Sequence, residues 1–204
     1  MTEAPPTVLS LTLTGAHHGD RPVLGPLSLS LDRGDTLALC GPSGIGKSTL
    51  LRIIAGLHGG YDGTRQVTGR LAMVFQEPTL LPWRDVLRNV TLLSGCSTEE
   101  AREILAEVGL SDRSDAYPGA LSLGQQRRLS LARAVAARPD LLLLDEPFVS
   151  LDPDLVQEMI GLVDRLRQSR GFALILVTHA EAEAKRLAAR CLRLDGTPAS
   201  LAAA

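Results

Sequence analysis

One stretch decides the fold of this 204-residue chain: Gly41-Pro42-Ser43-Gly44-Ile45-Gly46-Lys47-Ser48-Thr49. It fits the pattern G-x-x-x-x-G-K-[ST] and lies between an apolar, strand-like run at 36–40 and a helix-like run that begins at Leu50. The glycines allow backbone N–H groups to turn inward around an anion without Cβ clashes. The N-terminus of the following helix points about half a positive charge at the same anion. The stretch therefore predicts a cradle for phosphate groups.

Two side chains of this cradle have a specific chemistry. Lys47 offers an ammonium to the β- and γ-phosphates of a nucleotide, and the Ser48 hydroxyl offers a hard oxygen ligand to Mg²⁺. All residues from Gly41 to Thr49 are candidate nucleotide-binding residues. The alternative is an ordinary glycine-rich turn, which the flanking strand-like and helix-like runs disfavour.

A second stretch supplies acidic groups: Leu141-Leu142-Leu143-Leu144-Asp145-Glu146. Four consecutive apolar residues indicate a central parallel strand buried on both faces. Ligands bind at the C-terminal edge of such a sheet, so we expect both carboxylates beside the cradle. We expect Asp145 to organise the Mg²⁺ shell and Glu146 to polarise the attacking water. The alternative is an acidic pair that only ends a strand before a proline turn.

With these stretches the chain resembles the nucleotide-binding subunit of ATP-binding cassette (ABC) transporters over nearly its whole length. Leu121-Ser122-Leu123-Gly124-Gln125 is similar to the family's LSGGQ signature, which in the family completes the active site of the facing subunit. Ser122, Gly124 and Gln125 are therefore candidate nucleotide-binding residues. Ser122 is also a favourable N-cap for a helix expected from about 123 to 137, whose N-terminus offers a second anion site.

The resemblance also implies roles for four further residues. Gln76 matches the Q-loop glutamine, a catalytic group and metal ligand, and His179 matches the switch histidine that senses the γ-phosphate. Asp152 matches the end of the loop between the subunits, and His18 falls where the family has an aromatic ring on adenine. A lone glutamine or histidine is more often structural, but the order and context of these residues favour the functional interpretation.

The chain departs from the family pattern at two positions. Leu123 replaces the first glycine of the signature, and Val149 replaces the serine of the loop between subunits. Neither change removes a catalytic group. We expect them to affect turnover and dimer affinity more than the existence of activity.

The predicted fold is α/β, with a P-loop NTPase core, a mostly parallel central sheet, an N-terminal antiparallel β subdomain and an inserted α-helical subdomain. A single ABC ATPase domain is expected over 1–204, with the core at 1–76 and 139–204 and the helical subdomain at 77–138. Period-two alternation at 9–13 and 27–31 predicts the antiparallel strands. Further strands are expected near 71–75, 172–178 and 191–194. Helices are expected near 97–108, where Ser97 to Glu100 form a capping box, and near 154–168 and 180–189.

Composition excludes several classes of function and location. A net charge of −2 gives no electrostatic footprint for nucleic acid, and 3% aromatic residues leave few stacking platforms for bases. No apolar run approaches the roughly 18 to 20 residues that span a bilayer, and residues 1–6 lack the parts of a signal peptide. We expect no regulatory domain in the short, Ala-rich end after 196. We therefore expect a cytoplasmic chain, peripheral on the cytoplasmic face of the cell membrane.

The cysteines and four of the arginines are expected to have structural roles. Cys40, Cys96 and Cys191 are odd in number and far apart in the sequence, which favours reduced thiols. Four arginines spread around a helix that is expected to end before Pro139, which favours a solvated, ion-paired face over a nucleic-acid surface. They are Arg127, Arg128, Arg133 and Arg138.

The resemblance implies ATP and Mg²⁺ as cofactors and several partners. In the family, the region corresponding to 77–90, which here holds the only Trp, lines the groove for a coupling helix of the membrane permease. An isolated Trp such as Trp83 is nevertheless more often part of a core. A second ABC subunit, expected to be identical, binds head to tail, and an extracytoplasmic solute-binding protein acts indirectly.

The segment Leu-Leu-Pro-Trp-Arg at 80–84 is similar to importers of the nitrate, sulfonate and taurine type. Importers of thiamine precursors are an open alternative, and so are exporters. Chromosome and repair ATPases insert long coiled coils between Gln76 and the signature, whereas this chain has only about 45 residues there without a sustained heptad.

Overall fold

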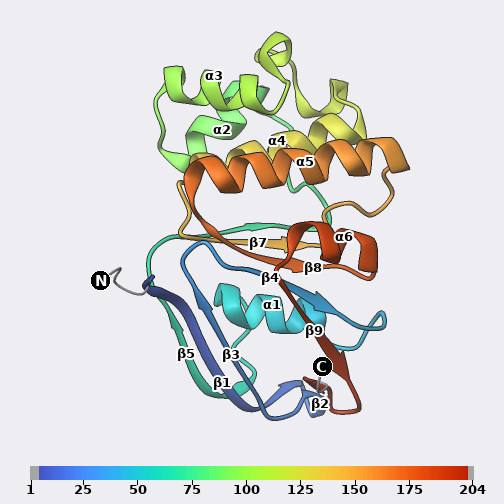
Figure 1. Ribbon diagram of the computed structural model, residues 1–204. Coiled ribbons are helices and arrows are strands. Elements are labelled where there is room, and N and C mark those ends of the chain that lie inside the picture. The colour runs from blue at the N-terminus through green and yellow to red at the C-terminus, as the bar shows by residue number, and fades with distance from the viewer. Residues whose placement is uncertain (1–4, 202–204) are drawn as a thin grey trace.

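The computed structural model describes residues 5–201, in which a six-stranded sheet lies between a group of helices and a smaller sheet (Figure 1). The strand order is β10-β9-β4-β8-β7-β6. The strands are β4 (Thr36–Cys40), β6 (Leu71–Val74), β7 (Leu141–Asp145), β8 (Ala173–Val177), β9 (Arg190–Asp195) and β10 (Ser200–Leu201). All neighbours run parallel except β10, which is antiparallel to β9. Every residue of β7 and β8 is buried, as the continuous apolar runs predicted.

The parallel arrangement brings four chain segments to one edge of the sheet. Strand β4 leads into the cradle, β7 ends at Asp145, β6 is followed by Gln76 and β8 is followed by His179. Because the carboxyl ends of parallel strands meet at a common edge, these groups lie on the side where ligands bind in open α/β sheets.

The smaller sheet is antiparallel and contains β1 (Thr7–His18), β2 (Arg21–Leu24), β3 (Leu27–Asp32) and β5 (Tyr61–Val67). Along β1, Leu9, Leu11 and Leu13 are buried while Ser10 and Thr12 are exposed, which confirms the period-two prediction. Helix α1 (Lys47–Ala55) lies between the two sheets (Figure 1) and shares one hydrophobic core with both of them.

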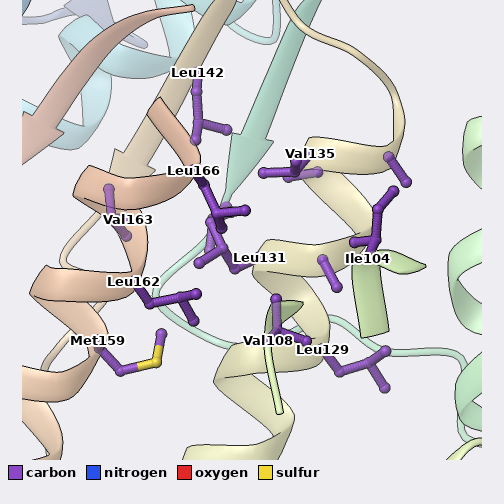
Figure 2. Packing of buried hydrophobic residues seen from close by; sticks show 14 of the residues in the cluster. Ile104, Val108, Leu129, Leu131, Val135, Leu142, Met159, Leu162, Val163 and Leu166 are labelled. Atoms are coloured by element: carbon purple, nitrogen blue, oxygen red, sulfur yellow. The ribbon is translucent and has the colours of Figure 1, made fainter. Parts of the chain in front are cut away.

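A second hydrophobic core joins the helices on the other face of the parallel sheet. These helices are α2 (Val86–Ser94), α3 (Thr98–Glu107), α4 (Leu123–Ala136) and α5 (Pro153–Arg170), with two 3₁₀ turns, η1 (Ser111–Arg113) and η2 (Pro118–Ala120), in the connection to α4. Figure 2 shows Leu131 and Val135 of α4 in the same cluster as Leu162 and Leu166 of α5 and Leu142 of β7. Helix α4 packs on α2 and α3 and also on α5, which follows residue 138 in the sequence. The boundary between a helical subdomain at 77–138 and the core at 139–204 therefore stays a prediction.

Most of the predicted elements are present, with ends displaced by a few residues. The last helix, α6 (Glu181–Leu187), is two residues shorter at its C-terminus than predicted. Ser97 and Ser122 cap α3 and α4 with their hydroxyls, as predicted. Helix α2 and strands β2, β5 and β10 were not assigned from the sequence. Within residues 5–201, no helix is long and apolar enough to cross a bilayer. Predictions about 1–4 and about 202–204 lie outside the described residues.

The prediction of one solvated arginine face on α4 is wrong for two of its members. Arg127 is only 5% exposed, and Arg133 donates to the backbone carbonyl and hydroxyl of Thr79. Burial lowers the pKa of both guanidinium groups. Arg128 and Arg138 form the expected ion pairs, with Glu158 and Glu100. The helix is covered on several sides, so arginines spread around it cannot all reach solvent.

Two of the three cysteines, although far apart in the sequence, are neighbours in space. Cys40 on β4 and Cys191 on β9 lie on adjacent strands, with their Sγ atoms 2.8 Å apart. Separation in the sequence gave no indication of this contact, because it depends on the pairing of β4 with β9.

Candidate active site

The phosphate cradle connects β4 to α1, and two of its glycines have backbone conformations that favour glycine. Gly41 has φ 142° and Gly46, the N-cap of α1, has φ 112°. A Cβ on Gly41 would lie 2.7 Å from the carbonyl oxygen of Leu194, and one on Gly46 would lie 2.8 Å from Leu24 Cδ2. Larger residues at either position would strain the loop or displace its neighbours.

Lys47 is held inside the cradle by the loop's own backbone. Its Nζ donates to the carbonyl oxygens of Gly41 at 2.9 Å and Pro42 at 2.8 Å, and the residue is 4% exposed. An ammonium group has three N–H donors, so one is left for an anion. The buried position gives this positive charge a fixed place at the N-terminus of α1.

Asp145 at the end of β7 reaches Ser48 at the start of α1. The Ser48 hydroxyl donates to Asp145 Oδ1 over 2.9 Å. Burial raises the pKa of Asp145, and the Ser48 hydrogen bond opposes that rise only in part. None of the ion pairs found within residues 5–201 includes Asp145. A buried carboxylate without an ion-pair partner, beside a hydroxyl oxygen, suits a hard divalent cation as its counter-charge.

Glu146 follows Asp145 in a sterically unfavourable conformation. Its φ is 46°, and its backbone N–H donates to the carbonyl of Val177 over 3.0 Å. This turn places Glu146 Oε2 4.0 Å from His179 Nδ1. The His179 side chain is 63% exposed and the Glu146 side chain 20% exposed, so both are accessible from the same edge of the sheet.

A cleft of about 260 Å³ lies beside these groups, although Asp145 and His179 are not among its lining residues. It is lined by Ser43, Gly44, Gly46, Lys47, Ser48, Thr49, Gln76 and Glu146. The structure therefore brings the cradle, Gln76 and Glu146 together around this cleft, although they lie up to about 100 positions apart in the sequence.

A neighbouring hollow of about 290 Å³ contains the predicted base-stacking residue His18. The hollow shares Gly44 and Thr49 with the cleft and also includes Ile45, Arg21, Val23 and Thr197. The rings of His18 and His58 are nearly parallel, at 8°, with centroids 6.0 Å apart. Sequence analysis missed Val23, Thr197 and His58, since isolated residues from separate strands and loops carry no local signal.

The predicted residues of the signature and of the 149–152 loop do not line the cleft of their own chain. Ser122 Oγ accepts from Gln125 N over 3.3 Å, and Gln125 Oε1 accepts from Ser122 N over 3.0 Å, which forms a reciprocal cap on α4. Asp152 caps α5 by accepting from Leu155 N over 2.9 Å. Gly124 is buried against Leu155, and Leu123 beside it is 41% exposed.

Arg127 connects the two loops that flank the cleft. Its guanidinium donates to the carbonyl oxygen of Phe75 at 3.5 Å and to that of Val149 at 3.4 Å. Phe75 directly precedes Gln76, and Val149 lies three residues after Glu146. Arg127 therefore lies between the backbone of the Q-loop position and the backbone that follows the acidic pair. It was not identified as a site residue from the sequence.

The family follows from a direct comparison with known proteins. A family model described as "ABC transporter" matches residues 24–149, more than half of the chain. The chain belongs to the ABC transporter family. Members of this family bind and hydrolyse ATP in a transporter complex with a membrane permease, which agrees with the family resemblance, the fold and the ATPase activity predicted from the sequence.

Relatives of this ABC chain include proteins named "Aliphatic sulfonates import ATP-binding protein". One from Yersinia pestis is 45% identical over 198 residues, which cover 93% of this chain and 73% of the relative. One from Streptomyces avermitilis is 49% identical over 177 residues, which cover 86% of this chain and 68% of the relative. A solved structure, described as an inward-facing conformation of a metal-chelate type ABC transporter, has a TM-score of 0.86 and 26% identity. The match covers 96% of this chain and 83% of that one.

Proposed function

We propose that this ABC chain is the ATP-hydrolysing subunit of an importer for aliphatic sulfonates. The observation that carries the ATPase assignment is the single cleft shared by Lys47, Ser48, Gln76 and Glu146. The solute class is supported by relatives at 44–49% identity whose names specify aliphatic sulfonate import. These relatives also fit the sequence-based expectation of the nitrate, sulfonate and taurine type.

In this proposal the residues of the cleft have distinct tasks. The inward-facing N–H groups of the cradle and Lys47 hold the β- and γ-phosphates of ATP. Glu146 accepts a proton from the attacking water, and its strained turn fixes the carboxylate at the edge of the sheet. His179, whose Nδ1 lies 4.0 Å from Glu146 Oε2, responds to the γ-phosphate in this proposal.

Mg²⁺ is the cation that fits the oxygen groups at this position. Ser48, Asp145 and Gln76 would hold it, and bound Mg²⁺ would supply charge neutralisation for the β- and γ-phosphates. The buried, unneutralised carboxylate of Asp145 supports this assignment.

We further propose that two copies of the chain act head to tail. Ser122, Gly124, Gln125 and Asp152 lie away from the cleft of their own chain, although they belong to the segments that carry the family resemblance. In a head-to-tail pair these residues of one copy contact the nucleotide in the cradle of the other. ATP closes the pair, and hydrolysis reopens it.

The surface after Gln76 is the proposed docking region for the permease. Trp83 is 67% exposed, so the expectation that an isolated Trp belongs to a core does not hold here. The buried Asn89 fixes this segment by hydrogen bonds to both backbone groups of Leu81 and to the carbonyl of Arg84. A rigid segment with an exposed aromatic residue suits a coupling helix at the cytoplasmic face of the membrane. The solute-binding protein would act on the opposite side.

Growth on defined sulfur sources tests the proposal. A strain lacking the gene should grow on sulfate but not on an aliphatic sulfonate as sole sulfur source, and the wild-type gene should restore growth. The Lys47→Ala gene should fail to restore it at equal protein level. Normal growth of the deletion strain on sulfonates, in a host without a second such importer, would contradict the solute assignment. A growth defect on nitrate or without thiamine would instead favour one of the alternative solutes.

A further inference from the structure

A pair of thiols lies outside the nucleotide cleft and has no part in the proposed ATPase cycle. Cys40 is the last residue of β4, and Cys191 is the second residue of the adjacent β9. The Sγ atoms are 2.8 Å apart, closer than two sulfur atoms that only touch. The residues are 151 positions apart in the sequence, so the sheet creates the pair.

The pair is open to small molecules from the side of α6. A hollow of about 360 Å³ contains both cysteines, together with Glu181, Lys185 and alanines of α6 and the following turn. Its lining residues are different from those of the cleft and of the hollow around His18. Cys191 is exposed and Cys40 half-buried, so an entering molecule meets the Cys191 sulfur more readily.

We propose that Cys40 and Cys191 form a reversible dithiol–disulfide site whose oxidant is a low-molecular-weight disulfide. The Cys191 thiolate attacks one sulfur of the small disulfide and forms a mixed disulfide, and the first small thiol leaves with a proton from solvent. The Cys40 thiol then loses its proton and attacks the Cys191 sulfur, which releases the second small thiol. Two protein thiols are oxidised to one disulfide, and one small disulfide is reduced to two thiols.

The surroundings of the two sulfurs set the order of these steps. Burial and the neighbouring Cys191 raise the pKa of Cys40 to about 12, so Cys40 is a poor first nucleophile near neutral pH. Once Cys191 carries the mixed disulfide, the short distance to Cys40 makes the second attack effectively intramolecular. The third cysteine, Cys96, lies near the start of α3 and has no such neighbour among the described residues.

The bridge would connect the cradle to the edge of the sheet. Cys40 directly precedes Gly41, whose carbonyl oxygen holds Lys47, and β9 neighbours β10 at the edge of the sheet. A disulfide between residues so distant in the sequence restricts the unfolded chain strongly, so oxidation should raise the melting temperature by at least about 5 °C. The proposal does not depend on the solute or on the ATPase assignment.

Oxidation of the reduced full-length chain by glutathione disulfide is the direct test. In buffers of increasing glutathione disulfide, we expect the free thiol count to fall from three to one, with Cys96 still free. Peptide mapping without reduction should identify the Cys40–Cys191 bridge. The bridge should form at a ratio of glutathione disulfide to glutathione about tenfold lower than the ratio needed to modify Cys96. Dithiothreitol should reverse both the bridge and the shift in melting temperature.

Two variants serve as matched controls. Cys96→Ser should oxidise like the wild type, whereas Cys191→Ser should form no bridge and show no shift in melting temperature. Both changes are small and involve side chains that are at least partly exposed, so both variants should fold. Equal modification of all three thiols, a mixed disulfide on Cys191 that never resolves, or persistence of both thiols would each overturn the proposal.

Discussion

The Ser48 hydroxyl donates to Asp145 Oδ1 over 2.9 Å and so joins residues that are 97 positions apart. The contact connects the first turn of α1 with the end of β7, which are held together by the sheet and the core around α1. Both oxygens belong to the group expected to hold Mg²⁺. The buried charge of Asp145 therefore lowers the stability of the protein alone, and in the proposed function it would bind the cation.

Asp145→Asn should stabilise the chain in the absence of divalent cations. The variant keeps an oxygen that can accept from Ser48 but removes a buried charge, so the free energy of unfolding at pH 7 should rise by about 1 kcal/mol. Urea unfolding in EDTA measures this. Because the pKa of Asp145 is raised above 3.8, the wild-type carboxyl gains a proton as the pH falls, and the difference between variant and wild type should shrink between pH 7 and pH 4.

A variant that is less stable than the wild type at pH 7, or a difference independent of pH, would contradict this account of Asp145. The same variant should lose Mg²⁺-dependent ATP hydrolysis. Asp164→Asn is a suitable control, because that carboxylate is 40% exposed on α5 and pairs with Arg167 at the surface.

Lys47→Ala should lower the affinity for ATP by at least about 100-fold, since it removes a charge-assisted hydrogen bond to the phosphates. Equilibrium dialysis measures the affinity, and circular dichroism checks that the variant is folded. Lys185→Ala removes a positive charge that is 79% exposed on α6 and should leave ATP affinity unchanged. Unchanged affinity in a folded Lys47→Ala protein would mean that the cradle has been assigned wrongly.

Arg127→Met should reduce turnover several-fold while ATP affinity changes little. The guanidinium positions the backbone before Gln76 and after Glu146, and neither loop contributes the main phosphate contacts. The free energy of unfolding should change by less than about 1 kcal/mol, because removal of a buried charge offsets the loss of two long hydrogen bonds to carbonyl oxygens. Steady-state kinetics separates kcat from KM.

Arg128→Met is the matched control on the same helix. Its guanidinium binds Glu158 and the carbonyl of Val108, both remote from the cleft, so its turnover should stay near that of the wild type. Equal loss of turnover in both variants would show that Arg127 acts only through the stability of α4. Partial recovery of turnover in Arg127→Lys would support the positioning role.

Leu123→Gly should lower stability with little effect on turnover. The residue begins α4 and is 41% exposed, so glycine costs about 1 kcal/mol through helix propensity and removes little packing. Ser122 still caps the helix, and Gly124 still packs on Leu155. Thermal unfolding and steady-state turnover measure the two effects. A several-fold rise in turnover would show that Leu123 crowds the interface between subunits.

The sequence predicted the cradle, the acidic pair and the N-caps of α3 and α4, because each depends on a local pattern with its own physical cause. It did not predict the contact of Cys40 with Cys191 or the position of Arg127 between two loops. Both depend on which elements become neighbours, and a single cysteine or arginine has the same local signal in either environment. Helix α2 was missed because it has only nine residues and directly follows a segment that contains Pro78 and Pro82.

In the proposed function, Glu146 is the general base of an ATPase that closes as a head-to-tail pair. Glu146→Gln preserves the size of the side chain and one accepting oxygen but removes its basicity. The decisive measurement is size-exclusion chromatography with light scattering on this variant in MgATP, alongside its steady-state turnover. We predict a stable dimer that requires ATP, with turnover at least about 100-fold below that of the wild type. A monomer in MgATP with turnover near that of the wild type would contradict the claim.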